Sequence, residues 1–530
     1  MAQETTGSIL LSNGRFHRTA FDIDPASALL VRGDRIAWIG NRADAPAADR
    51  TIDLDGACVL PGLTDAHIHI FTLALARLQL GFAAHRPRVL ADVFSLLQQE
   101  QARLAPGEWL QALELNEDML AERRLPTRDE LDAMFGDQPV LLRRYCGHVA
   151  VFNTAAMQRL GLAEHQPDPV SGHFERFADG RLKGIAYEGA AEAIFRAGPI
   201  PAEHLLRQGI RDAITDCTKL GLTALTEAAV GFSAGHDRED AIWDSLRGDD
   251  DLPVRMGFMA QLTAGEAAER KRTPAFDRRW SRETLKFFAD GIVGGRTSAL
   301  SEPFCDRGGT GTFVLPENVL VAEILAAHEA GWRVAVHATG DRAIALVASA
   351  YEAAEGKQRE RRGHRIEHCF CPPPDLFPRL KAIDAFVVMQ PSFLWRMGPS
   401  IEAGLGRRTE TAYPGRSVLD AGAQLVFSSD APTGLFSPWE GVRSAAERKS
   451  SNGSILGPAE AVSVREAVHA YIAGGAEAMH HSPFRGRLEV GQAADLAAFD
   501  RDPFEAEGAA LAATRATLTM IDGRIVHHDA

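Results

Sequence analysis

Short strands with alternating apolar and polar residues are predicted at both ends of the chain. Four such segments lie near the N-terminus: 8–12, 28–32, 35–39 and 51–55. Three more lie near the C-terminus: 494–499, 516–521 and 524–527. The alternation is typical of strands with one buried face, and the turn Asn13-Gly14 favours a hairpin. We expect residues 1–61 and 482–530 to pair into one β-sandwich domain, since domain insertion is tolerated where chain ends lie close.

The central part of the chain alternates short apolar runs with helical stretches such as 319–330 and 342–355. One of the runs ends in His67 and His69. The seven others are 222–226, 254–258, 285–289, 333–337, 365–368, 385–389 and 424–428. Short, wholly apolar runs are typical of parallel strands that are buried on both faces. This alternation predicts an α/β fold, a TIM-like (β/α)8 barrel built from residues 62–72 and 206–481.

Residues 73–205 do not fit this barrel pattern. They contain helices and a further strand, 139–143, and they follow the first barrel strand. The loops after barrel strands gather at the active-site face. We therefore expect this insertion to form a cap or lid over that face.

The composition and net charge of the chain argue against some classes of binding partner. The 530-residue chain has a net charge of −14, which argues against binding nucleic acid through a basic surface. It has no apolar run of the roughly 20 residues that cross a membrane, and its first residues do not resemble a signal peptide. Its six cysteines form no regular framework. These features predict a cytoplasmic protein with reduced thiols and a small-molecule substrate.

Candidate metal ligands follow the predicted barrel strands. His67 and His69 are spaced i, i+2, so in an extended strand both imidazoles point to the same side. The pair alone is more often structural, but further polar residues lie at the ends of other strands. The full set is His67, His69, Lys286, His337, His368 and Asp430. Carboxyl ends of barrel strands meet at one rim, and imidazoles with a carboxylate suit one or two divalent ions, with zinc the first expectation.

Each of these residues also has a structural interpretation. His337 and His368 could be hydrogen-bonded core histidines. Asp430 precedes Ala431-Pro432 and could cap a helix. Lys286 could form an ion pair with Asp290. Their occurrence on successive strand ends of one barrel favours the metal site over these separate explanations.

Six motifs resemble the amidohydrolase superfamily, and most closely its branch of N-substituted formamide deformylases. They are PGLTDAHIHI (61–70), LKFFADGIVGGRTSAL (285–300), VAVHATGDRA (334–343), RIEHC (365–369), VFSSDAPTG (426–434) and RLEVGQAADLAAFDRDPF (487–504). The resemblance implies that His67, His69 and Asp430 hold one metal and that His337 and His368 hold a second. It also implies that Lys286, carbamylated by CO2, bridges the two ions, because a carbamate offers anionic oxygens and an ammonium offers no lone pair.

Two positions depart from the pattern of this branch. The branch often has Asp-Gly-His after the inserted strand, where this chain has Cys146-Gly147-His148. It often has a His-Asp pair at the position where this chain has Thr226-Glu227. His148 is retained, so a role toward the substrate carbonyl remains open for it, whereas the role of the missing Asp does not carry over.

The predicted activity is hydrolysis of an amide, N-formyl or N-acyl C–N bond by metal-activated water, with Asp430 as general base and His148 as a second catalytic group. His148, Arg296, Phe393 and Trp395 are the candidate substrate contacts, although Arg296 could instead hold its own loop and the two aromatic residues could be core packing. Deamination or ester or lactone hydrolysis on the same scaffold is the alternative. A non-catalytic relative is a third interpretation, and a homodimer is possible.

Overall fold

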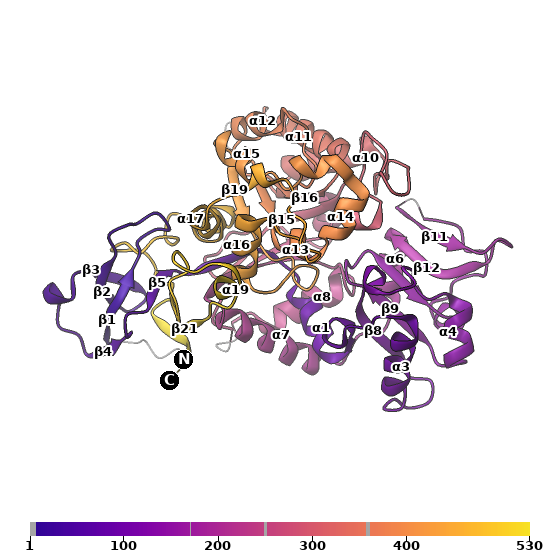
Figure 1. The fold of residues 1–530 in the computed structure, drawn as a ribbon, viewed down its shortest axis with the longest axis horizontal. Coiled ribbons are helices and arrows are strands. Elements are labelled where there is room, and N and C mark those ends of the chain that lie inside the picture. The colour runs from indigo at the N-terminus through magenta and orange to yellow at the C-terminus, as the bar shows by residue number, and fades with distance from the viewer. Residues whose placement is uncertain (1–6, 170, 249–251, 357–360, 530) are drawn as a thin grey trace.

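The computed structural model describes residues 7–169, 171–248, 252–356 and 361–529. In Figure 1 these residues form three adjoining parts. A sheet made from both chain ends lies at the left, the barrel with its helices lies in the centre, and the insertion lies at the right. Within these residues, no helix has the length and apolar character that a membrane crossing needs.

Eight parallel strands form the central sheet, in the order β19-β18-β17-β16-β15-β14-β13-β6. They are β6 (Leu63–Ile68), β13 (Leu222–Val230), β14 (Arg255–Ala260), β15 (Trp280–Phe288), β16 (Arg333–Ala338), β17 (Arg365–His368), β18 (Phe386–Met389) and β19 (Gln424–Phe427). At the carboxyl ends of the first and last strands, the Asp430 N–H donates to the His67 carbonyl and the His69 N–H donates to the Ala431 carbonyl, at 2.8 and 2.9 Å. These two bonds join the sheet ends at the carboxyl rim, which confirms the predicted barrel.

Helices follow most of the barrel strands and cover them. They include α7 (Glu203–Thr218), α8 (His236–Leu246), α9 (Ala264–Glu269), α10 (Glu317–Glu329), α11 (Asp341–Glu355), α12 (Leu376–Ala382), α15 (Gly415–Asp420), α16 (Pro438–Glu447) and α17 (Val464–His469). In α11, the buried residues Ile344, Val347 and Tyr351 recur at a spacing of three or four, which makes one apolar face. The Tyr351 hydroxyl donates to the Arg365 carbonyl at 2.8 Å, so this face is also fastened to β17.

The two chain ends share one mixed sheet, in the order β22-β21-β20-β5-β1-β2-β3, with β4 paired to β1. Its strands are β1 (Ser8–Phe16), β2 (Ala26–Arg32), β3 (Arg35–Gly40), β4 (Arg50–Asp53), β5 (Cys58–Pro61), β20 (Leu496–Phe499), β21 (Ala516–Ile521) and β22 (Arg524–His528). Ile36 of β3 and Ile525 of β22 pack on the same apolar cluster although their strands lie at opposite ends of the order. The sheet therefore folds over its own core, as expected for the paired chain ends.

The insertion contains a sheet of its own, which the sequence did not predict beyond one strand. Its order is β11-β12-β10-β9-β8-β7. The strands are β7 (Leu80–Gly81), β8 (Leu110–Leu115), β9 (Val140–Arg144), β10 (Val149–Phe152), β11 (Gly172–Arg176) and β12 (Leu182–Glu188). Its helices are α1 (Ile70–Leu78), α2 (Phe82–His85), α3 (Leu90–Gln101), α4 (Arg128–Phe135), α5 (Thr154–Arg159) and α6 (Gly189–Ala197). The turn between β9 and β10 carries Cys146 and His148 to the barrel rim, so the insertion does contribute to the site.

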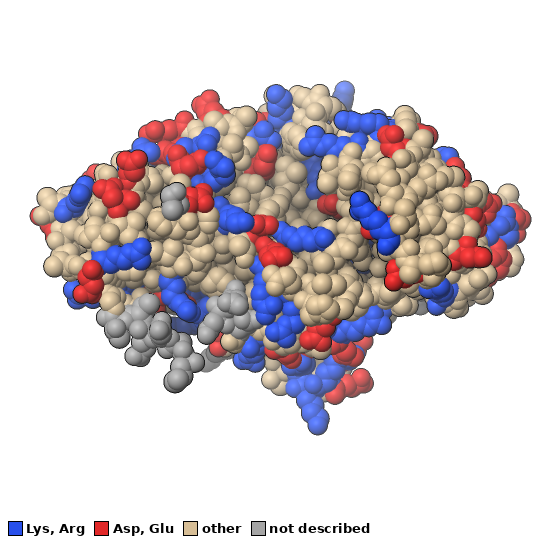
Figure 2. All heavy atoms as spheres, turned by 90° about the horizontal axis from the view of Figure 1, so that it is seen from below, with Lys and Arg blue, Asp and Glu red and all other residues tan. Residues whose placement is uncertain are grey.

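The surface charge is mixed on the face drawn in Figure 2. Lysine and arginine side chains are interspersed with aspartate and glutamate across this face, and neither sign forms a continuous patch there. On this face the two signs of charge are therefore mixed.

Candidate metal centre

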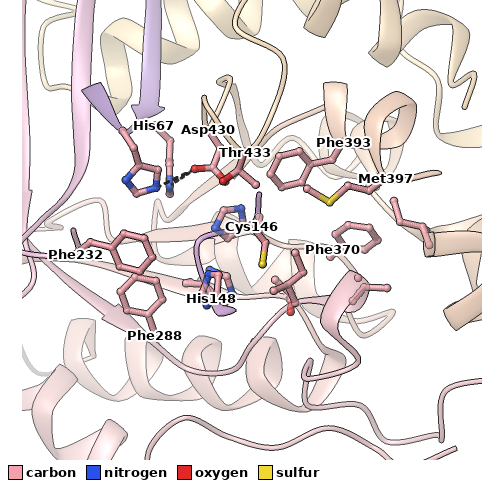
Figure 3. A pocket seen from close by; sticks show the side chains of 18 of the residues that line it. His67, Cys146, His148, Phe232, Phe288, Phe370, Phe393, Met397, Asp430 and Thr433 are labelled. Atoms are coloured by element: carbon pink, nitrogen blue, oxygen red, sulfur yellow. Dashed lines mark ion pairs between the residues drawn. The ribbon is translucent and has the colours of Figure 1, made fainter. Parts of the chain in front are cut away.

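A cavity of about 580 Å³, which includes open solvent at its mouth, lies at the carboxyl ends of the barrel strands. One part of its wall is polar and carries His67, His69, Cys146, His148, Lys286, His337, Thr339, His368, Asp430 and Thr433. The remainder is apolar and carries Phe232, Phe288, Ile292, Val293, Phe370, Phe393, Met397 and Ile401, with Gly294. Figure 3 shows His67 and Asp430 facing one another at one side of the cavity, with Phe393 and Met397 at the other.

The Asp430 carboxylate faces the imidazoles of His67 and His69 but forms no hydrogen bond with either ring. Its Oδ1 atom lies 3.0 Å from His69 Nε2 and 3.4 Å from His67 Nε2. Neither contact has the geometry of a hydrogen bond, and this buried oxygen has no other donor in the described ranges. One ligand atom each from His67, His368 and Asp430 lie within 4.8 Å of one another. Electron pairs of buried groups thus converge on one point, which is the arrangement that a bound cation requires.

The partners of the ring Nδ1 atoms show which histidine nitrogens are free. His67 Nδ1 lies 2.5 Å from Glu367 Oε2 and donates to it, because a carboxylate only accepts. His368 Nδ1 lies 2.7 Å from Gln390 Oε1, and the Gln390 amide nitrogen donates to Ser428 Oγ, which assigns the amide orientation. Both rings therefore present an unprotonated Nε2. A carboxylate or amide on the far nitrogen is the usual support of a metal-bound histidine.

His337 and Lys286 extend the polar wall. His337 Nε2 donates to the Gly291 carbonyl at 2.9 Å, so its Nδ1 is the free nitrogen, and its ring centre lies 4.4 Å from that of His368. Burial lowers the pKa of His67, His337 and His368 well below the usual histidine value, and nearby Lys286 lowers each further. Burial also lowers the pKa of Lys286 to about 8. The histidines are therefore neutral and able to bind a metal.

Backbone conformation places two of the candidate ligands. His368 has φ of +74° and Asp430 has φ of +53°. This region is unfavourable for residues with a side chain and costs on the order of 1–3 kcal/mol each, so it persists where the surroundings enforce it. His368 is the last residue of the short strand β17, and Asp430 follows the short strand β19. With these backbone conformations, both side chains line the cavity.

His148 reaches the cavity from the insertion. Its Nδ1 lies 2.8 Å from Glu188 Oε2, and its ring centre lies 5.3 Å from that of His337. Burial alone would lower the pKa of His148, but the Glu188 carboxylate raises it above the usual value. The ring is therefore held in place by one carboxylate while its other nitrogen faces the cavity.

The cavity brings together most of the residues that the sequence singled out: His67, His69, His148, Lys286, His337, His368, Phe393 and Asp430. Its tightest ligand set combines His67 and Asp430 with His368, which the resemblance had assigned to a second ion. In the described residues, Lys286 forms no ion pair with Asp290. Asp290 instead accepts backbone N–H groups of Ala299, Thr339 and Gly340, so it shapes the loops around the rim.

Arg296 and Trp395 do not line the cavity. Arg296 binds Asp306, the Val293 carbonyl and Ser400, so it holds the loop that follows β15, as one of the two interpretations expected. Trp395, in α13 (Ser392–Arg396), is 36% exposed and lies with Arg443 in a different hollow of the surface. The positions of Arg296 and Trp395 do not support the prediction that they contact the substrate.

Two supporting carboxylates, Glu367 and Glu188, were missed in the sequence, and a third, Glu227, was noted without a role. Glu367 orients His67, Glu188 orients His148, and Glu227 lies 3.9 Å from His69 Nδ1. Glu367 is also paired with Arg365 at 2.7 Å within the same strand. The i, i+2 spacing of Arg365 and Glu367, two charges in a strand buried on both faces, was a signal that these side chains share one interior face.

Replacing Glu367 with glutamine should weaken divalent-metal binding by about 10–100-fold, because the His67 ring loses the carboxylate that orients it and raises its basicity. Competition of the purified protein with a fluorescent chelator would measure this. Glu352→Gln is the matched control, because Glu352 pairs with Arg379 on the surface of α11. Equal affinity of E367Q and wild type would contradict the role of Glu367.

Comparison with known proteins agrees with this geometry. The family model described as "Amidohydrolase family" matches residues 50–527. The chain belongs to the amidohydrolase family. It is 30% identical to the Bacillus subtilis protein YtcJ over 90% of each chain, and 28% identical to the N-substituted formamide deformylase of Arthrobacter pascens over 94% of each. A metal-dependent hydrolase from Pyrococcus furiosus superposes on this amidohydrolase with a TM-score of 0.72 and 26% identity, covering 94% of this chain and all of the other.

Proposed function

We propose that this amidohydrolase cleaves the C–N bond of a linear, apolar N-acyl or N-formyl amide. The observation that carries the proposal is the buried Asp430 oxygen, which faces the unprotonated Nε2 of His67 without a hydrogen-bond donor, beside a cavity whose other wall is apolar. A cation site at the edge of an apolar pocket suits a substrate with one polarised carbonyl and an apolar substituent.

His67, His69, His368 and Asp430 would hold a divalent ion, and His337 with Lys286 could hold a second. Zinc is the first choice, because imidazole and carboxylate ligands suit it. When bound, the ion supplies a Lewis acid for the scissile carbonyl and for water. Lys286 is buried with a pKa of about 8, so its uncharged amine is accessible near neutral pH. That amine would attack the carbon of CO2 and release a proton, giving the anionic carbamate that a ligand role requires.

The remaining steps fall to side chains of this chain. Asp430 would take the proton of the attacking water and deliver it to the leaving nitrogen, as a general base and then a general acid. His148, held by Glu188 and charged when protonated, would donate a hydrogen bond from Nε2 to the carbonyl oxygen and stabilise its developing charge. The insertion would exclude water from these groups, because it supplies the β9–β10 turn that lines the cavity.

The apolar wall supports the choice of substrate class. Phe232 and Phe288 stack with ring centres 5.8 Å apart on one side, and Phe370, Phe393 and Met397 lie on the other. Such a surface favours an aromatic or branched aliphatic substituent. The name of the similar Arthrobacter pascens protein supports an N-substituted formamide as the first compound to test.

The proposal is tested by removing the metal and assaying a panel of amides, lactones and aminated heterocycles. Dialysis against a chelator should abolish turnover, and Zn2+, Mn2+ or Co2+ should restore it. The expected products of an N-alkyl formamide are formate and the amine in equal amounts. Release of ammonia without a carboxylic acid would favour a deaminase, and cleavage of lactones alone would favour an ester hydrolase. A metal-free protein that gains no activity with any ion would indicate a non-catalytic relative.

A further inference from the structure

A second group of potential metal ligands lies in the terminal sheet, away from the barrel rim. His17 directly follows β1, Cys58 is the first residue of β5, and Asp502 follows β20. One ring nitrogen, one sulfur and one carboxylate oxygen from these residues lie within 4.8 Å of one another. The side chains are almost completely enclosed, since the three residues are 4%, 1% and 9% exposed. Three parts of the sequence thus bring an imidazole, a thiol and a carboxylate to one buried point.

The protonation state of His17 leaves one nitrogen free. Its Nδ1 lies 2.9 Å from the Asp22 carbonyl oxygen, and because a carbonyl only accepts, Nδ1 carries the hydrogen. In the neutral ring Nε2 is then an unprotonated acceptor. It is buried and has no hydrogen-bond partner within the part of the chain that the structure describes, and the nearby Cys58 thiol does not supply one. A histidine whose Nδ1–H is fixed by a backbone carbonyl is the usual form of a metal-binding imidazole.

Asp502 is held in position but retains acceptor capacity. One carboxylate oxygen accepts the Phe504 N–H at 2.8 Å, and the other lies 3.1 Å from Arg15 Nη2. Each carboxylate oxygen offers two lone pairs, so these contacts leave room for a further interaction. The Phe504 ring also packs edge-on against His17 with centres 5.2 Å apart, which fixes the orientation of the imidazole.

A third histidine cluster shows that proximity alone is not enough. His328, Glu355 and His364 also approach one another within 4.8 Å. However, the Val334 N–H donates to His364 Nδ1 at 3.0 Å, so the hydrogen of the neutral ring is on Nε2. That Nε2–H points at His328 Nδ1, 2.8 Å away, and makes an ordinary hydrogen bond. The nitrogen that would have to bind a metal is therefore protonated in this cluster, whereas it is free in His17.

We propose that His17, Cys58 and Asp502 form a second metal site that binds Zn2+ or a similar borderline divalent ion. The N, S and O donors match zinc, and a solvent molecule would supply the fourth position. Binding replaces the thiol proton of Cys58, which is released to solvent. The site has a structural role: it ties the end of β1 and the start of β5 to the loop after β20, and so links the two ends of the chain.

Cobalt substitution tests this site separately from the barrel centre. A thiolate bound to Co2+ gives an intense near-ultraviolet charge-transfer band, whereas the ligands expected at the barrel centre are nitrogen and oxygen atoms. The full-length protein should show this band on loading with Co2+, and Cys58→Ser should abolish it. Cys217→Ser is the matched control, because Cys217 is buried in α7 and belongs to no metal-ligand group in the described residues. Cys146→Ser controls for the thiol that lines the barrel cavity.

The C217S and C146S variants are expected to retain the band. Absence of the band in the cobalt-loaded wild type, or its loss in C146S and persistence in C58S, would overturn the proposal. Asp502→Asn supplies a second measurement if C58S does not fold: after equilibration with zinc and removal of excess metal, it should hold one ion per chain fewer than wild type. Equal zinc content in D502N and wild type would also overturn the proposal. None of these results tests the barrel centre, because the substitutions leave its candidate ligands unchanged.

Discussion

Replacing Asp430 with asparagine should lower kcat by about 10²–10⁴-fold, measured with saturating metal on whichever amide the wild type hydrolyses best. The carboxylate lies 3.0 Å from His69 Nε2 and 3.4 Å from His67 Nε2, at the point where water and substrate must meet. Asparagine has nearly the same shape and can still offer an oxygen to the metal, but it cannot take a proton from water. The loss should therefore fall mainly on kcat and leave KM within a few-fold.

Asp341→Asn is the matched control for D430N. Asp341 begins α11 near the same rim, but its carboxylate accepts the N–H of Ser301, and it does not line the cavity. We expect this variant to retain near-wild-type kcat. Retention of activity by D430N at equal metal content would remove Asp430 from the general-base role, although the metal site would remain.

Replacing Asp495 with asparagine should reduce the free energy of unfolding by about 3–5 kcal/mol, because it removes the carboxylate shared by two buried guanidinium groups, which leaves Arg485 without an ion pair among the described residues and Arg255 with Asp522 alone. Asp495 precedes β20 of the terminal sheet, and its carboxylate pairs with Arg255 of β14 at 2.7 and 3.0 Å. Arg485 lies 3.4 Å from the same group. The side chains of all three are no more than 2% exposed. Chemical denaturation followed by circular dichroism would measure the loss.

The same variant predicts a pH dependence. Burial opposes ionisation of Asp495, but Arg255 and Arg485 hold its pKa below the ordinary value of 3.8. The stabilisation from its charge is thus complete above that value and is lost as the pH falls below it. The stability difference between wild type and D495N should shrink in the same acidic range. Asp420→Asn, which disrupts an exposed pair with Arg416, should change stability by less than about 1 kcal/mol. An equally small change in D495N would contradict the structural role of the buried cluster.

The clustering of the candidate ligands at the barrel rim was predictable because one rule connects them. Parallel strands place their carboxyl ends at the same rim, so histidine, lysine and aspartate residues on or just after five of the predicted strands could be assigned to one site without knowing the contacts. The closed eight-stranded sheet and the joining of the chain ends followed from local patterns of the same kind. The barrel and the terminal sheet depend on which segments are strands and on their order, and the pattern of apolar and polar residues indicates both.

Other features depend on contacts that no local pattern encodes. The β7 strand is only two residues long, and the β7–β8, β8–β9 and β10–β12 pairs each join strands with a helix between them, so the insertion was predicted with one strand. The β9–β10 and β11–β12 pairs are local hairpins, which the prediction missed. His67 and Glu367, which are hydrogen-bonded to one another, are 300 residues apart in the sequence. Arg296 and Trp395 have side chains suited to binding a substrate, but their orientation is set by Asp306 and by the direction of α13. Composition could not reveal either orientation.

The two hydrogen bonds that close the barrel connect the backbone of His67 and His69 with that of Asp430 and Ala431. His67, His69 and Asp430 are themselves candidate ligands, and Ala431 is the next residue after Asp430. Metal capture at the rim therefore has to wait until the last barrel strand has emerged from the ribosome and docked against the first. A partly synthesised or truncated chain would expose isolated histidines but no assembled cation site, so tight metal binding would distinguish completed molecules from nascent ones.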